Sequence, residues 1–166
     1  MITGPLKWYT VAEELRLASH VGLSVAPDRS GVVPGAIAWD ECDCGLLAVS
    51  LAQIYLSDEF PTPQTVGIGS RCDVAWEVGE FVIQIIRCAP NPEGQSLSPT
   101  VAALDASAQE VLRDAYELLK AVSERLCEMD DANDIGDFFL RPLTSQGPGG
   151  GCVGNELRAL VSLRRN

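Results

Sequence analysis

The residues best suited to chemistry in this sequence are its six cysteines. Residues 39–45, WDECDCG, place Cys42 and Cys44 one residue apart, among carboxylates and behind a tryptophan. Such a segment could be half of a metal site, a redox site, a pair of disulfide arms, or an acidic turn with small buried thiols. The remaining cysteines stand singly in the sequence, as Cys72, Cys88, Cys127 and Cys152.

The motifs that would make the chain an enzyme are missing from the sequence. Structural zinc sites favour C-x2–4-C pairs, and the chain has one C-x-C pair and no thioredoxin-like C-x-x-C. Its one histidine, His20, has no nucleophile motif nearby. The glycine-rich stretches 67–72 and 147–154 lack the G-x-x-x-x-G-K-[ST] pattern and a following helix. We therefore expect a protein that is not an enzyme and that holds no cofactor or metal.

Length and composition bound the class of protein. The chain has 166 residues, of which 46% are hydrophobic and 21% charged, and this predicts a single folded domain over residues 1–166. Its net charge of −11 argues against gripping DNA through phosphates and suits repelling it. Arg158, Arg164 and Arg165 near the C-terminus are either solvated charges or contacts for an acidic partner. Neither an 18-residue apolar run nor a secretory signal occurs, so we expect folding in a reducing compartment, with disulfides only if the product later leaves it.

Hydrophobic periodicity predicts an α+β fold, a mostly antiparallel sheet with helix on one face. The expected helices cover residues 5–24 and about 99–128, and the expected strands cover 45–56, 72–88, 135–143 and 152–163. The expected loops lie at about 26–38, 57–71 and 144–151. Thr10 and Ser98 are the expected helix N-caps, and Gly79 is expected at a bulge or bend.

The helix at about 99–128 carries the strongest pattern in the chain. Its apolar residues recur at alternating spacings of three and four: Val101, Leu104, Ala108, Val111, Ala115, Leu118 and Val122. Arg113 and Glu117 form an i,i+4 pair on the polar side. The seam suits either a coiled coil or a helix lying on a sheet. We favour the second because two seam positions are only alanine.

The predicted strand order groups the cysteines. If strands 45–56 and 72–88 run in opposite directions and the long helix returns beside them, the thiols fall at two ends of the sheet. One group is Cys42, Cys44, Cys88 and Cys152, and the other is Cys72 with Cys127; either group could form disulfides. The WDECDCG segment is then the acidic entry turn of a strand, with Trp39 as an apolar anchor.

Three segments together resemble a known family. WDECDCGLLAVSLAQIYLSDEFP, VGEFVIQIIRCAPNPEGQSLSPT and GPGGGCVGNELRALVSL are similar to neck proteins from tailed phages of actinobacteria, across most of residues 39–163. The family pattern has adjacent cysteines where this chain has C-D-C, and G-G-E where it has G-N-E. The resemblance best suits the tail terminator, which implies a sheet-plus-helix fold. A head-tail stopper would be expected as a small β-barrel and an adaptor as mainly helical.

The resemblance implies a structural role in the virion, at the neck on top of the tail, after assembly in the cytoplasm of the host bacterium. It implies a homo-oligomeric ring, usually a hexamer, that caps the major tail tube protein and meets the head-tail stopper or connector. Genomic DNA would pass through the ring without tight binding, and no membrane would be involved.

Contacts between subunits are expected in the N-terminal segment, loop 57–71 and loop 144–151. The last of these includes Gly147, Gly149, Gly150 and Gly151. The rival hypotheses are a stopper or other connector protein, and a thiol-based redox or small-molecule-binding α+β protein.

Overall fold

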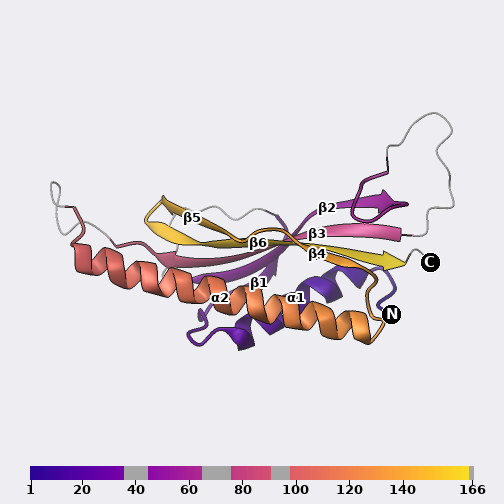
Figure 1. The fold of residues 1–166 in the computed structure, drawn as a ribbon, viewed down its shortest axis with the longest axis horizontal. Helices are drawn as coiled ribbons and strands as arrows, with labels where there is room; N and C mark the ends of the chain where they lie inside the picture. The colour runs from indigo at the N-terminus through magenta and orange to yellow at the C-terminus, as the bar shows by residue number, and fades with distance from the viewer. Residues whose placement is uncertain (36–44, 65–75, 91–97, 165–166) are drawn as a thin grey trace.

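Two helices and a six-stranded sheet make up the described part of the chain, as Figure 1 shows. The computed structural model describes residues 1–35, 45–64, 76–90 and 98–164. In chain order the elements are α1 (Lys7–Gly22), β1 (Ser30–Val33), β2 (Leu46–Ser57), β3 (Trp76–Cys88), α2 (Val101–Asp131), β4 (Phe138–Leu140), β5 (Thr144–Gly149) and β6 (Cys152–Arg164). The predicted α+β class, with a mostly antiparallel sheet packed by a long helix, is confirmed.

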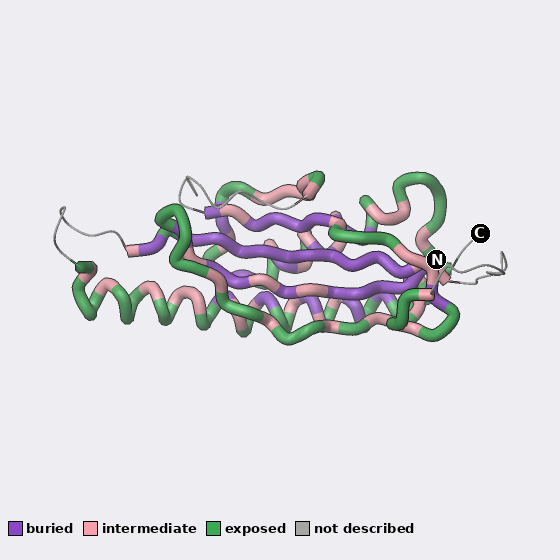
Figure 2. Tube along the Cα trace, turned by 90° about the horizontal axis from the view of Figure 1, so that it is seen from above, coloured by how far each residue is buried: buried purple, intermediate pink, exposed green. Residues whose placement is uncertain are grey.

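The sheet is built around its two longest antiparallel neighbours, β3 and β6. The strand order is β1-β2-β3-β6-β4, and β5 also pairs with β6. β1 runs parallel to β2, whereas the pairs β2–β3, β3–β6, β4–β6 and β5–β6 are antiparallel. Figure 2 shows burial concentrated along the central strands. Both faces of β3 are buried over most of its length, as its unbroken apolar run predicts.

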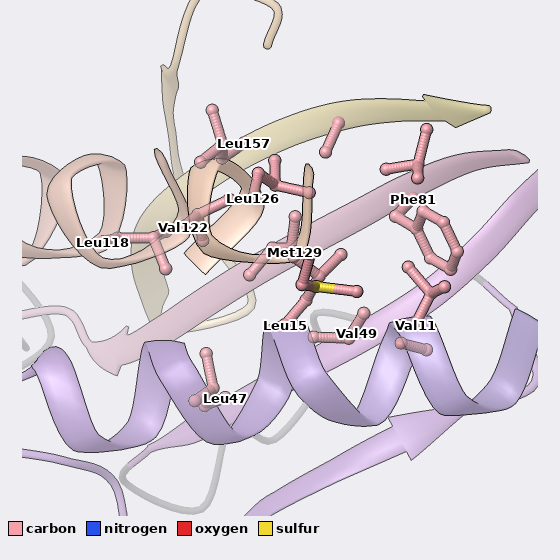
Figure 3. Packing of buried hydrophobic residues seen from close by; sticks show 14 of the residues in the cluster. Val11, Leu15, Leu47, Val49, Phe81, Leu118, Val122, Leu126, Met129 and Leu157 are labelled. Carbon is pink, nitrogen blue, oxygen red and sulfur yellow. The ribbon is translucent and has the colours of Figure 1, made fainter. Parts of the chain in front are cut away.

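The core lies between the sheet and the two helices. Side chains that alternate along the strands point toward the helices, because successive residues of a strand face opposite sides. Figure 3 shows the contributors from α1, α2 and the strands. They include Val11, Leu15, Leu47, Val49, Phe81, Leu118, Val122, Leu126, Met129 and Leu157, each at most 1% exposed. The last two positions of the predicted seam, Leu118 and Val122, are therefore core, as expected for a helix lying on a sheet.

Two predicted loops contain strands. β1 lies within the expected loop 26–38, because four residues suffice to pair in parallel with β2 at the edge of the sheet. β5 occupies most of the expected loop 144–151 and forms a hairpin with β6. Gly150 and Gly151 both have positive φ, of 57° and 75°, which is what a two-residue hairpin turn demands. These glycines therefore build a hairpin turn, and the expectation of a loop over 144–151 was wrong.

The predicted ends of the helices were also displaced. α2 begins two residues after the predicted start, with Thr100 in place of Ser98 as the N-cap, and its Oγ1 accepts a hydrogen bond from the Ala103 N–H at 3.2 Å. It runs to Asp131 instead of ending at about residue 128. Thr10 is not an N-cap, because it lies inside α1 and donates its hydroxyl proton to the Leu6 carbonyl.

Gly79 serves close packing instead of a bulge. The bulge falls on the partner strand β2, between Leu51 and Gln53. A Cβ on Gly79 would lie 2.6 Å from the ring of Trp8, so the missing side chain lets α1 approach the sheet. The sequence predicted a bulge or bend at Gly79. In the structure, the glycine instead makes room for the ring of Trp8.

Candidate assembly surfaces

The first half of α2 extends beyond the part of the helix that α1 covers (Figure 1). α1 ends at Gly22, against Ala121 of α2. The following turn still reaches α2, because the Ser24 N–H donates to Glu117 Oε2 at 2.8 Å. This hydrogen bond is the main reason that the pKa of Glu117 lies below its ordinary value. Residues 101–113 have no comparable cover from α1, and Val101 is 83% exposed.

A buried ion pair fixes the point from which α2 extends. Arg87, near the end of β3, donates from Nε and Nη2 to the two carboxylate oxygens of Asp114 at 2.7 and 3.0 Å. Both side chains are at least nine-tenths buried. Burial acts to lower the pKa of Arg87, but its hydrogen bonds and attraction to Asp114 outweigh this and raise it. Nη2 of Arg87 also donates to the Val25 carbonyl, which ties in the segment after α1. Strand, long helix and α1 are thereby held at one point.

An apolar groove lies between the first half of α2 and the β5–β6 hairpin. We call it the hairpin groove, with a volume of about 480 Å³. Its lining comes from the segment just after β3, from Pro99 and the first half of α2, and from the hairpin. The lining residues are Ala89, Pro90, Pro99, Leu104, Ser107, Ala108, Val111, Ser145, Gln146, Gly147, Pro148 and Val153. None of the described side chains that line it is charged, so this lining suits apolar side chains better than a charged substrate.

The glycines predicted at subunit contacts sit in and beside this groove. Gly147 lines it, and Gly149, Gly150 and Gly151 lie at the tip of the hairpin. Gly147 has a φ of 101°, and a Cβ there would lie 2.7 Å from the Cys152 carbonyl oxygen. Asn155 of β6, which is fully buried, donates to the Val111 carbonyl at 2.8 Å and joins the hairpin to α2. The groove therefore has two walls that the hydrogen bond from the buried Asn155 joins.

A second apolar surface on α2 was missed from the sequence. Leu112, Tyr116 and Leu119 are 66%, 69% and 41% exposed. With Leu104 and Ala108, which are also exposed, they form a row that we call the α2 ridge. The spacing of four, four, four and three residues was visible in the sequence. The predicted seam included Leu104 and Ala108 but left the other three residues of the row unassigned.

The described residues do not assemble a catalytic constellation. Within them, no group of three or more His, Cys, Asp or Glu side chains is placed to hold a metal ion. His20 is half-buried on α1. On the sheet face away from the helices, Glu80 is almost fully buried. Its carboxylate accepts a hydrogen bond from Gln53 and forms ion pairs with Arg158 and Arg141. Neither described helix is long and apolar enough to cross a membrane.

The described cysteines are divided between a buried and an exposed setting. Cys88 is exposed and lies opposite Cys152 at the end of the β3–β6 pair, but it is not the disulfide partner of Cys152. Cys152 is fully buried and disulfide-bonded. Cys127, on α2, is an exposed thiol. Cys42, Cys44 and Cys72, together with Trp39, lie outside the described residues. The grouping of Cys72 with Cys127 and the place of the C-D-C segment stay predictions.

The C-terminal arginines do not form a single patch where the structure describes them. Arg158 donates to Glu156 at 2.7 Å and lies 3.3 Å from Glu80. Arg164 is six residues further along β6, or about 20 Å away at the rise of a strand. Arg165 lies outside the described ranges. Arg158 thus belongs to a polar network within the sheet.

Comparison with known proteins adds no relative. No family model matches the chain, and no curated protein matches it. The function must therefore be argued from the residues and from these surfaces.

Proposed function

We propose that this chain is a structural protein of the phage neck, a tail terminator that forms a ring, expected to be a hexamer, on top of the tail tube. The ring joins the tube to the head connector, and the genome passes through its lumen. The motif resemblance motivates this proposal, and the α+β fold with both described helices on one sheet face supports it. In the described residues the sheet has edges at β1 and at β4 and β5, unlike the closed barrel expected of a stopper.

The observation that carries the proposal is the hairpin groove, which no described element covers. An apolar hollow between two elements is a common setting for a bound ligand or partner. Here the first half of α2 and the glycine hairpin form two joined walls with no core of their own between them. A ring subunit accounts for this arrangement, because a neighbouring subunit or ring supplies the missing apolar side chains.

Charge and cysteine chemistry are consistent with this role. α2 holds eight acidic and three basic residues, a net charge of −5 out of −11 for the chain. An acidic surface beside DNA repels phosphates, so a genome slides past it instead of binding. The disulfide at Cys152 suits a protein that ends in a particle outside the reducing cytoplasm.

Cryo-electron microscopy of the particle that contains the chain tests the proposal. We expect a six-fold ring of this chain between the connector and the tail tube, with the hairpin groove filled by a neighbouring chain. A position elsewhere in the particle, including that of the stopper, would contradict the terminator assignment.

A reconstitution with purified tail tubes and heads gives a second measurement. Leu104→Glu places a charge in the groove and should abolish joining. Leu17→Glu provides the matched control, because Leu17 is similarly exposed but lies on α1, away from the groove. Equal loss of joining in both variants would count against the groove as the assembly surface.

A further inference from the structure

The α2 ridge has a pattern that makes it complementary to itself. Its members are Leu104, Ala108, Leu112, Tyr116 and Leu119, each exposed. Residues three and four apart on a helix are neighbours, so these side chains form one continuous row. The row spans about 22 Å at the rise of a helix. No described element of the same chain covers it.

An antiparallel pairing of two such ridges about Leu112 matches large residues with small ones. Position 108 of one copy then meets position 116 of the other, so that Ala108 leaves room for Tyr116. Leu104 of one copy falls opposite position 120 of the other, one residue from Leu119. Ridges pack into grooves when bulky and small residues alternate across a helix pair.

The same pairing also matches opposite charges. It places Asp105 of one copy opposite position 119 of the other, one residue from Lys120, so that the two side chains lie within reach of each other twice per dimer. Both side chains are accessible, since Asp105 is exposed and Lys120 is 58% exposed with only a long 4.0 Å contact to Glu124. A parallel pairing would instead bring Asp105 against Asp105 and Lys120 against Lys120. Arg113, next to Leu112, lies near its own copy in either arrangement. Charge therefore selects the antiparallel arrangement.

We propose that the free protein forms a two-fold dimer in which the α2 ridges of two copies pack antiparallel about Leu112. The occupant of the ridge is thus a second copy of this chain. The inference goes beyond the proposed function and does not depend on it. Because Leu104 and Ala108 belong to both surfaces, the dimer closes access to the hairpin groove, and the copies must separate before a neighbour can enter it.

The length of the ridge determines the expected affinity of the dimer. Two helices in contact along about 22 Å bury less surface than a standard interface, which buries about 800 Å² per partner. The dimer should therefore be reversible, and its population should rise with concentration over the micromolar range. Sedimentation equilibrium of the full chain across that range gives the dissociation constant.

Charge exchange tests the arrangement. Asp105→Lys and Lys120→Asp, each alone, replace two attractions per dimer with two repulsions and should weaken dimerisation by about tenfold or more. The double variant restores opposite charges in the antiparallel arrangement and should return the dissociation constant to within about threefold of the original. Val21→Glu, at an 83% exposed site on α1, is the matched control and should leave it unchanged.

Circular dichroism of each variant verifies folding, and Tyr116→Ala provides a change without charge that should also weaken the dimer. A protein that stays monomeric throughout the range would overturn the proposal. So would a dimer that the two single charge changes leave intact, or that the double variant fails to restore. None of these measurements uses the phage particle, so failure of the dimer and failure of the neck assignment are separate results.

Discussion

At the scale of residues, the buried ion pair of Arg87 and Asp114 is the contact most important for stability among those described. Their bidentate contact joins the centre of the sheet to the long helix where the helix leaves the cover of α1. Removing one partner of a buried ion pair is costly because the other charge stays buried without compensation. The pair should therefore matter more for stability than the exposed ion pairs along α2 do.

We predict that Asp114→Asn lowers the free energy of unfolding by about 3 kcal/mol. Asparagine keeps the shape of the side chain but leaves the Arg87 guanidinium without its carboxylate. Asp130→Asn, at an exposed position of the same helix, should change it by less than about 0.5 kcal/mol. Urea unfolding followed by circular dichroism measures both. A loss below about 1 kcal/mol for Asp114→Asn would mean that Glu110, 3.7 Å from Arg87, takes over the role.

Single residues were the least predictable level from the sequence. Arg87 and Asp114 are 27 residues apart, and local spacing suggested instead that Arg113 pairs with Glu117. Such long-range pairs follow from the tertiary arrangement, which periodicity does not contain. The opposition of Cys88 and Cys152 was within reach because strand order alone brings the two strand ends together.

At the scale of elements, long periodic segments were predicted well and short edge segments were not. β2, β3, β6 and α2 carry enough apolar residues at a fixed period to fix their type. β1 and β5 are short, lie at sheet edges and contain glycine or border proline, so composition favoured loops. Strand pairing at an edge depends on what lies next to the segment in space, which explains both errors.

The hairpin turn gives a prediction at this scale. Gly150→Val puts a β-branched residue at a φ of 57° and should lower the free energy of unfolding by about 1–3 kcal/mol. Gly150→Asn is the matched control, because asparagine tolerates this conformation and should cost well under 1 kcal/mol. Thermal and urea unfolding of the two variants test the difference. Equal stability of both would show that the turn does not hold this conformation in solution.

At the scale of the whole molecule, the described fold has a well-packed part and an extended part. The core between α1, the second half of α2 and the central strands is closed. The first half of α2 and the β5–β6 hairpin lie beyond this core. They form the two sides of the hairpin groove, which no described element covers. The sequence predicted one continuous seam along α2, and it could not show where along the helix the cover from α1 ends.

This division predicts a gradient of stability that assembly should remove. In dilute free protein, amide hydrogens of residues 144–149 and of 104–112 should exchange at least about tenfold faster than those of 122–129, because local opening is easiest where few buried contacts must break. Hydrogen exchange read by mass spectrometry measures this gradient. In the assembled particle the first two segments should slow strongly, while 122–129, already buried in the free chain, serves as the internal reference and stays unchanged. Exchange of the hairpin that is equally fast in both states would mean that nothing fills the groove on assembly, and the ring role of this surface would then be wrong.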